Sequence, residues 1–140
     1  MDDFELHPDL ARDGHFVIDL TLCRVLMIDD ANYPWFVLVP RRPGLRELHD
    51  LNDADAELFW AESRSIGRTL LDRFEGDKLN VAALGNVTPQ LHVHHIVRYR
   101  DDAAWPRPVW GTVPPIGYPP EVADRRITEV RTWLEQRPTG

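Results

Sequence analysis

The sequence predicts an α+β fold with a mainly antiparallel sheet, one long helix and a C-terminal helix. Short runs rich in Val, Ile, Leu and Phe fill the first forty residues, a stretch of helical periodicity follows, and two more apolar runs precede a last helical stretch. Strands and helices segregated in this way are typical of α+β proteins. We expect one domain over 1–140, with a core at about 15–100, an arm rich in Pro and Trp at about 101–120, and a terminal helix at about 121–136.

Three strands are expected at the start of the chain. Apolar runs cover 15–20 and 22–28, and the second run ends at a turn sequence rich in Asp and Asn at 29–32. A third run, 35–39, is stopped by Pro40, because proline cannot donate a hydrogen bond to a central strand pairing. The turn between the last two runs indicates an antiparallel pair.

A long helix should follow the third strand. Asn52 or Asp53 can accept hydrogen bonds from the first amides of this helix. Four apolar residues then recur at helical spacing: Phe59, Ile66, Leu70 and Phe74. Gly76 lies just past them, where a helix would stop. Further strands are expected at 79–84 and 91–98.

The last helix should begin near Pro120, because proline is well tolerated at a first helical position. Its buried face is indicated by three apolar residues at helical spacing: Ile127, Val130 and Leu134.

Composition and charge argue against several function classes. Acidic residues outnumber basic ones 23 to 16, giving a net charge of −7, whereas proteins that bind duplex nucleic acid usually present a basic face. No apolar run approaches the roughly 20 residues needed to cross a bilayer, and the acidic N-terminus is unlike a secretory signal. Cys23 is the single cysteine, which excludes an internal disulfide or a multi-cysteine zinc site. We expect a cytoplasmic protein with no membrane partner.

The densest chemical signal is a cluster of three histidines within four positions. On a strand, side chains alternate between the two faces. One face would be polar, with Gln90, His92, His94 and Arg98. The other would be mostly apolar and would pack under the long helix, with Leu91, Val93, His95 and Val97. His95 is therefore better interpreted as a hydrogen-bonded core histidine than as a catalyst.

Two other interpretations of this polar face of the strand stay open. It could be a solvated strand face, although such faces more often carry Thr, Lys or Glu. It could also bind zinc, because His92 and His94, two positions apart on a strand, can reach one ion. A zinc site needs a third ligand, and His95 would point to the other face. The favoured reading has no metal and no cofactor.

Three stretches resemble the histidine triad (HIT) family. The run at 90–98 reads QLHVHHIVR and resembles the motif His-φ-His-φ-His-φ-φ, where φ is apolar. The run at 37–43, followed by 48–51, resembles the strand-to-helix passage of the Fhit branch, which hydrolyses dinucleoside polyphosphates. The pair at 85–86 resembles a Gly-Gln pair that contacts phosphate. The similarity extends over 25–98 and implies a HIT-like fold.

The resemblance implies a nucleotide phosphohydrolase that acts on dinucleoside polyphosphates or related nucleotidyl compounds. His92 matches the nucleophile that attacks the α-phosphorus and forms a nucleotidyl-histidine, and a neutral imidazole suits that role. His94 and Gln90 match the outer triad positions and are the other expected catalytic residues. The expected substrate-binding residues are Asn86, Asn80, Asp29 and Arg98. The family also commonly forms homodimers through its sheets.

Two departures from the family pattern keep a second function open. Gln90 replaces the first triad histidine and cannot shuttle a proton at neutral pH. Phe36 stands where many members carry a histidine in a Pro-Gly-His run. Both bear on protonation of the leaving group, so the alternative is a catalytically weak nucleotide-binding module.

The segment at 105–111, with two tryptophans held between prolines, has no counterpart in the core motif. Its aromatic side chains could cover the pocket of this or a neighbouring subunit, or they could seal a dimer. We slightly favour the dimer arm.

Overall fold

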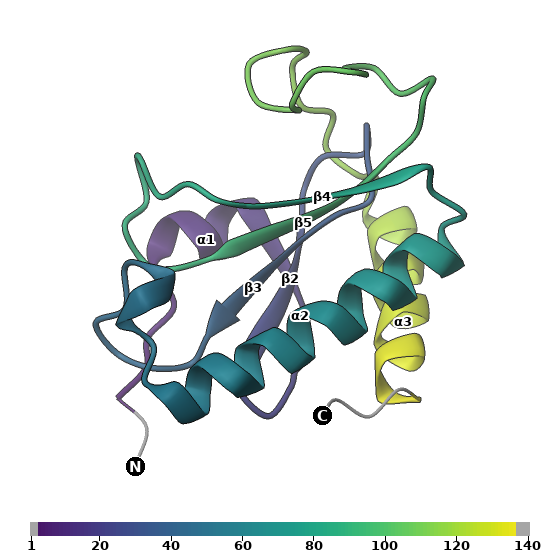
Figure 1. The fold of residues 1–140 in the computed structure, drawn as a ribbon. Helices are drawn as coiled ribbons and strands as arrows, with labels where there is room; N and C mark the ends of the chain where they lie inside the picture. The colour runs from purple at the N-terminus through teal and green to yellow at the C-terminus, as the bar shows by residue number, and fades with distance from the viewer. Residues whose placement is uncertain (1–2, 137–140) are drawn as a thin grey trace.

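The computed structural model describes residues 3–136, and their architecture confirms the α+β prediction. Its strands form one antiparallel sheet in the order β1-β2-β3-β5-β4 (Figure 1). The strands are β1 Gly14–Asp19, β2 Cys23–Ile28, β3 Trp35–Pro40, β4 Lys78–Ala83 and β5 Val93–Arg98. The helices are α1 Pro8–Asp13, α2 Asp53–Arg73 and α3 Pro120–Glu135, with a short 3₁₀ turn at Leu48–Asp50.

The sheet separates two apolar layers. On one face, α2 and α3 cover residues that alternate along the strands, including Phe36 and Leu38 of β3 and Val93 and Val97 of β5. Burial of these side chains is the main favourable contribution to folding. On the other face, α1 covers Val37 and its neighbours, and the segment after β5 covers another part.

The long helix begins and ends for the reasons that the sequence indicated. Asn52 caps it, because its Oδ1 accepts a hydrogen bond of 2.8 Å from the amide of Asp55. Past the helix, Glu75 adopts a positive φ of 52°, and the chain then passes close to β5. A Cβ atom at Gly76 would collide with Val97, so this glycine provides space for the chain to turn back toward the sheet.

An unexpected helix and a late strand start are the main differences from the sequence prediction; the other strand ends agree within one residue. The short helix α1 was not expected, because six residues are too few to show a helical period; the side chain of His7 accepts from the amide of Asp9 and so caps it. Strand β5 begins at Val93 rather than at Leu91. His92 therefore lies just before the strand.

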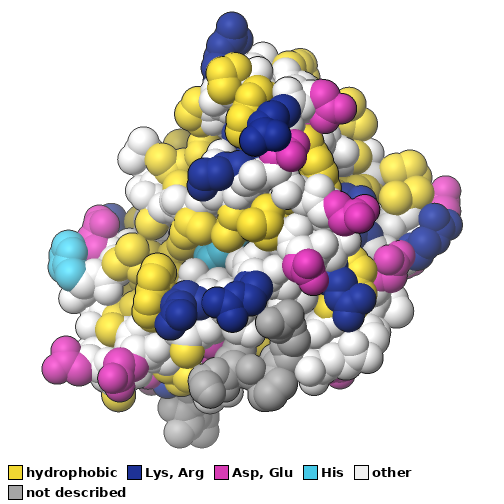
Figure 2. Space-filling model, turned by 45° about the vertical axis from the view of Figure 1, so that its right-hand side comes forward, with side chains coloured by type: hydrophobic (Ala, Val, Ile, Leu, Met, Phe, Trp, Pro, Cys, Tyr) yellow, Lys and Arg dark blue, Asp and Glu magenta, His cyan; other side chains and the backbone are white. Residues whose placement is uncertain are grey.

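The segment between β5 and α3 rises above the sheet without regular structure, and hydrophobic side chains lie among charged ones on this upper part of the molecule (Figure 2). It is anchored by Asp102, whose carboxylate accepts hydrogen bonds from the amides of Tyr99, Ala104 and Trp105. No helix within residues 3–136 is long and apolar enough to cross a membrane.

Candidate functional site

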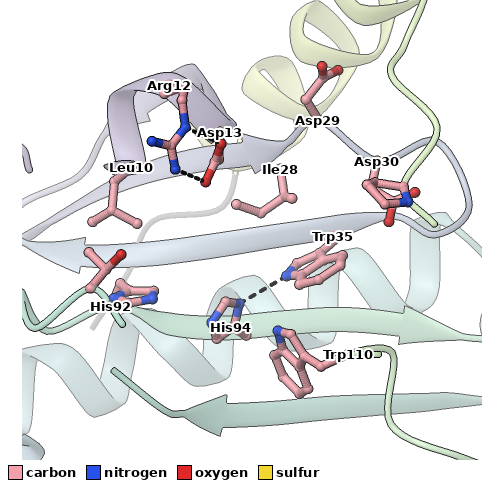
Figure 3. A pocket seen from close by; sticks show the side chains of 12 residues that line it. Leu10, Arg12, Asp13, Ile28, Asp29, Asp30, Trp35, His92, His94 and Trp110 are labelled. Atoms are coloured by element: carbon pink, nitrogen blue, oxygen red, sulfur yellow. Dashed lines mark hydrogen bonds and ion pairs between the residues drawn. The ribbon is translucent and has the colours of Figure 1, made fainter. Parts of the chain in front are cut away.

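A cavity of about 410 Å³ opens on the face of the sheet opposite to α2 (Figure 3). Segments from both ends of the chain meet there, because α1 and the segment after β5 flank the same two central strands. The lining residues are Leu10, Arg12, Asp13, Ile28, Asp29, Asp30, Trp35, Thr88, His92, His94, Trp110 and Pro115. The cavity thus combines two imidazoles, two indoles, three carboxylates and one guanidinium.

His92 is held in one tautomer at the wall of this cavity. Its Nδ1 lies 2.7 Å from the backbone carbonyl oxygen of Gln90. A carbonyl oxygen can only accept a hydrogen bond, so Nδ1 carries the proton and Nε2 carries the lone pair. The side chain is only 8% exposed, and the hydrogen bond fixes the orientation of the ring. In the neutral ring, the nucleophilic lone pair is therefore on Nε2.

His94 is fixed in the opposite sense. The indole Nε1–H of Trp35 donates a hydrogen bond of 2.9 Å to its Nδ1 (Figure 3). An indole N–H can only donate, so His94 carries its proton on Nε2 when it is neutral. Burial, followed by the nearby His92 and His95, lowers the pKa of His94 to about 3. At neutral pH His94 is thus a hydrogen-bond donor without charge.

Aromatic rings enclose the two histidines. The rings of His92 and His94 lie edge to face, with centroids 5.0 Å apart. The Trp110 ring also meets His94 edge to face at 4.9 Å, and it contacts Trp35 at 5.7 Å. Such contacts are favourable because the positive edge of one ring faces the negative face of another.

The position of Trp110 changes the interpretation of the Pro- and Trp-rich segment. Of the two roles expected for this segment, the cover over the pocket agrees with the structure, because Trp110 lines the cavity of its own chain, while the dimer arm stays a prediction. The segment is thereby part of the site of its own subunit.

His95 is confirmed as a core residue. Its side chain is fully buried on the α2 face, where Nδ1 lies 3.1 Å from the carbonyl oxygen of Val93 and Nε2 lies 2.7 Å from the hydroxyl of Ser63. The carbonyl requires a proton on Nδ1, so the Ser63 hydroxyl donates to Nε2. Burial lowers the pKa of His95 to about 4. Both ring nitrogens are used within the fold.

Asp29, an expected substrate-binding residue, lies on the cavity wall. Its Oδ1 accepts a hydrogen bond of 3.0 Å from the amide of Tyr118 and lies 3.1 Å from Nε2 of His15. The Tyr118 amide and then His15 lower the pKa of Asp29 below its usual value. The carboxylate thus tethers the start of α3 as well as facing the cavity.

The side chain of Gln90 faces away from the cavity, which corrects its expected catalytic role. Its Oε1 accepts a hydrogen bond of 2.8 Å from the amide of His7, and its Nε2 donates one of 2.9 Å to the carbonyl of Glu5. Because β5 begins only at Val93, the alternation expected for a strand does not extend back to this position. Gln90 forms its hydrogen bond with His92 through the backbone carbonyl.

Arg98 and Asn80 are engaged elsewhere, which corrects their expected contact with a substrate. Arg98 is 1% exposed and forms two hydrogen bonds, of 2.8 and 3.0 Å, with the carboxylate of Asp102. It also donates to Oδ1 of Asn80 at 2.8 Å. Burying a guanidinium requires such partners, so Arg98 is not available to a polyphosphate tail. Asn86 is exposed in its loop and does not line the cavity.

Phe36 also lies outside the site. Its side chain is fully buried on the α2 face, where its ring lies 6.1 Å from that of Phe74. The substitution of a histidine by Phe36 therefore removes no group from this cavity, contrary to the expectation that it bears on leaving-group protonation.

Sequence reasoning missed Trp35, and the signal that could have found it is strand alternation. In β3, Phe36 and Leu38 face α2, so Trp35 and Val37 must face the other side. Val37 pairs with His94, which places Trp35 beside the same row. Arg12, which forms ion pairs with Asp13 and Asp9, was missed because α1 was missed.

The zinc alternative lacks a complete ligand set in the described part of the chain. Within residues 3–136, no group of three or more His, Cys, Asp or Glu side chains is arranged to hold a metal ion. His92 and His94 each commit Nδ1 to a protein partner and have only Nε2 to offer.

Comparison with known proteins identifies the family. The HIT domain model matches residues 10–101, and no curated protein matches the chain. A histidine triad protein of Bradyrhizobium japonicum is 45% identical to this chain; the match covers 92% of this chain and 96% of that one, with a TM-score of 0.89. A histidine triad protein of Marinobacter aquaeolei VT8 is also 45% identical; the match covers 95% of this chain and 97% of that one, with a TM-score of 0.92. The HIT protein of Sinorhizobium meliloti 1021 is 33% identical over 93% of this chain and 96% of its own, with a TM-score of 0.90. The chain belongs to the histidine triad family.

Proposed function

We propose that this protein is a nucleotide phosphohydrolase of the Fhit type, which cleaves dinucleoside polyphosphates or related nucleotidyl compounds through a nucleotidyl-histidine on His92. HIT proteins are generally nucleotide hydrolases or transferases. The observation that carries the proposal is the hydrogen bond between Nδ1 of His92 and the carbonyl of Gln90, which leaves the lone pair on Nε2 at a cavity wall.

The reaction has two displacement steps. Nε2 of His92 attacks the α-phosphorus, forming a P–N bond as the bond to the bridging oxygen breaks and its electron pair leaves with the second nucleotide. The imidazole becomes cationic, and the Gln90 carbonyl stabilises it because Nδ1–H donates to that oxygen at 2.7 Å. Water then attacks phosphorus, the P–N bond breaks with its electron pair returning to Nε2, and the proton lost by the water passes to solvent, which restores neutral His92.

His94 acts in this scheme as a neutral donor to a non-bridging phosphoryl oxygen. Its proton is on Nε2, since Nδ1 accepts from Trp35. A donor placed in advance stabilises the charge that develops on the phosphoryl oxygens. With a pKa of about 3, His94 does not serve as an imidazolium acid at neutral pH.

The protonation that a leaving group needs limits the class of bond that this site can cleave. Neither the side chain of Gln90 nor that of Phe36 lines the cavity, so neither position delivers a proton to a leaving group. A phosphate leaving group, whose second pKa is about 6, departs as a stable anion without one. An amine leaving group requires a proton. Cleavage of a P–O bond is therefore favoured over cleavage of a P–N bond.

The test is to trap the intermediate. Protein quenched during turnover of diadenosine tetraphosphate should carry an adenylyl group on the peptide that contains His92, as detected by mass spectrometry. His92→Ala should lose the adduct and lower kcat at least about 1,000-fold. His49→Ala, at an exposed histidine that does not line the cavity, is the control. An adduct on another peptide, or unchanged turnover by His92→Ala, would refute the mechanism.

A nucleotide-binding module with little turnover is the second candidate. The observation in its favour is that the first triad position is Gln90, whose side chain is bonded to the N-terminal segment and offers no imidazole to the site. Calorimetry would then show binding of adenosine nucleotides, while prolonged incubation with diadenosine tetraphosphate would give no product.

We also propose a homodimer, as the family resemblance implied. Support comes from β4, which is an outermost strand of the sheet and can pair with another strand along its free edge. Light scattering at several protein concentrations should give the mass of two chains.

A further inference from the structure

We propose that Trp35 is a positioning residue that holds His94 in the tautomer with the proton on Nε2, so that this proton faces the phosphoryl group in the cavity. This inference rests on the proposed function. It assigns a role to a residue that lies outside the histidine motif and that acts through His94 rather than on substrate.

The first argument is the chemistry of the hydrogen bond. The Trp35 indole N–H is a donor only, and it lies 2.9 Å from Nδ1 of His94. In free histidine the proton can reside on either ring nitrogen. With the proton on Nδ1, two N–H groups would face each other, and the lone pair on Nε2 would face the phosphoryl oxygen. The bond excludes that arrangement.

The second argument is that the bond is shielded from water. Trp35 and His94 are 8% and 6% exposed, so water does not compete effectively for either nitrogen. The Trp110 ring lies against both partners, and the Tyr33 ring meets the Trp35 ring edge to face, with centroids 6.3 Å apart. In such surroundings a hydrogen bond is electrostatically stronger than in water.

The third argument is that the backbone fixes both partners. Trp35 and His94 lie on β3 and β5, which are neighbours in the middle of the sheet, with Trp35 opposite Ile96 and Val37 opposite His94. Their side chains emerge on the same face, in residue pairs that are two positions apart along the strands. Groups on adjacent strands are held more rigidly than groups on loops. Burial keeps His94 neutral, whereas Trp35 decides which nitrogen carries the proton.

The bond can be tested directly in the native protein. In ¹⁵N-labelled protein, long-range NMR correlations should report His94 with the proton on Nε2. A coupling across the hydrogen bond should connect the Trp35 indole nitrogen with Nδ1 of His94. A proton on Nδ1 in this spectrum would overturn the proposal, and this measurement needs neither a variant nor a substrate.

Trp35→Phe tests the consequence, because it retains an apolar ring and removes only the donor. We expect the His94 signals to move toward the tautomer protonated on Nδ1. We also expect kcat for diadenosine tetraphosphate to fall about tenfold to 100-fold while KM changes less than about twofold. Trp60→Phe, at an exposed position on α2, should change neither the spectrum nor kcat.

The possible results separate this inference from the proposed function. A shift of the tautomer with an unchanged kcat would refute the positioning role while leaving hydrolysis by His92 intact. A native protein that shows the tautomer and the coupling but hydrolyses no nucleotide would refute the proposed function instead. An unchanged tautomer in Trp35→Phe would refute the claim that Trp35 selects it.

Discussion

The two faces of β5 hold adjacent histidines that look alike by burial and differ in what their nitrogens meet. His94 and His95 are both buried, and burial lowers the pKa of each, to about 3 and about 4. His95 uses both nitrogens within the fold, on Val93 and Ser63. His94 uses one, on Trp35, and lines a cavity. A depressed pKa therefore does not distinguish the two histidines, whereas the presence of His94 alone in the lining of the cavity does.

The largest expected effect concerns the polar network on the cavity face. Asp102→Asn leaves the guanidinium of Arg98 buried without a charged partner, because the side chains of this pair are only 2% and 3% exposed. The free energy of unfolding should fall by about 3–5 kcal/mol in urea titrations. Arg100→Met breaks an exposed ion pair with Asp77 and should change the free energy of unfolding little. Equal effects of the two variants would contradict this account.

Acid should lower the stability of the fold through both His94 and His95, by the same mechanism. In the unfolded chain these histidines bind protons below pH 6.5, whereas in the folded protein His95 and His94 bind them only near pH 4 and 3. Stability is therefore lost as the pH falls from 6.5 toward 4, by about 2 kcal/mol per histidine at pH 5.

Unfolding titrations at pH 7 and pH 5 measure this difference, which should total about 4 kcal/mol. Carboxylates with lowered pKa values, such as Asp102 with a pKa of about 2, lose their contribution to stability only below the ordinary aspartate pKa of 3.8, which lies outside this window. His95→Gln should halve the pH dependence. A stability independent of pH between 5 and 7 would show that neither histidine is held neutral.

Replacing each of the two histidines by alanine should separate the effect on catalysis from the effect on folding. His94→Ala removes the donor to the phosphoryl oxygen and should lower kcat about 100-fold, or about 2.7 kcal/mol. His95→Ala leaves the Ser63 hydroxyl without its partner and opens a hole under α2, which should lower the free energy of unfolding by about 3 kcal/mol. Its activity per folded molecule should stay within about twofold. Equal losses of activity in both variants would contradict the assignment of His94 to catalysis and of His95 to stability.

The smallest effect should come from the indole that borders the cavity. Trp110→Ala removes an aromatic surface against which a base can stack, so KM should rise about tenfold, or about 1.4 kcal/mol, with kcat less affected. Steady-state kinetics with diadenosine tetraphosphate measures it. An unchanged KM would mean that the substrate does not touch Trp110.

Much of the architecture was predictable because its signals are local. The apolar runs gave the three leading strands within a residue or two, and the Asn52 cap and the position of Gly76 gave the limits of α2. Alternation along β5 separated His94 from His95 correctly. The same alternation misassigned Gln90, because it was extended beyond the point where the strand begins.

The amino-acid sequence by itself determined the order of the elements from β1 to α3, the opposite orientations of His94 and His95, and the resemblance to the HIT family. These depend on the period of a strand or helix and on motifs within a short stretch of chain. Only the tertiary structure decided that the N–H of Trp35 meets His94, that Trp110 closes on its own cavity, and that Arg98 pairs with Asp102 and Asn80. The partner of a buried hydrogen-bond donor depends on which segments pack together in the fold. The positions of donors along the sequence do not specify which acceptors they will meet.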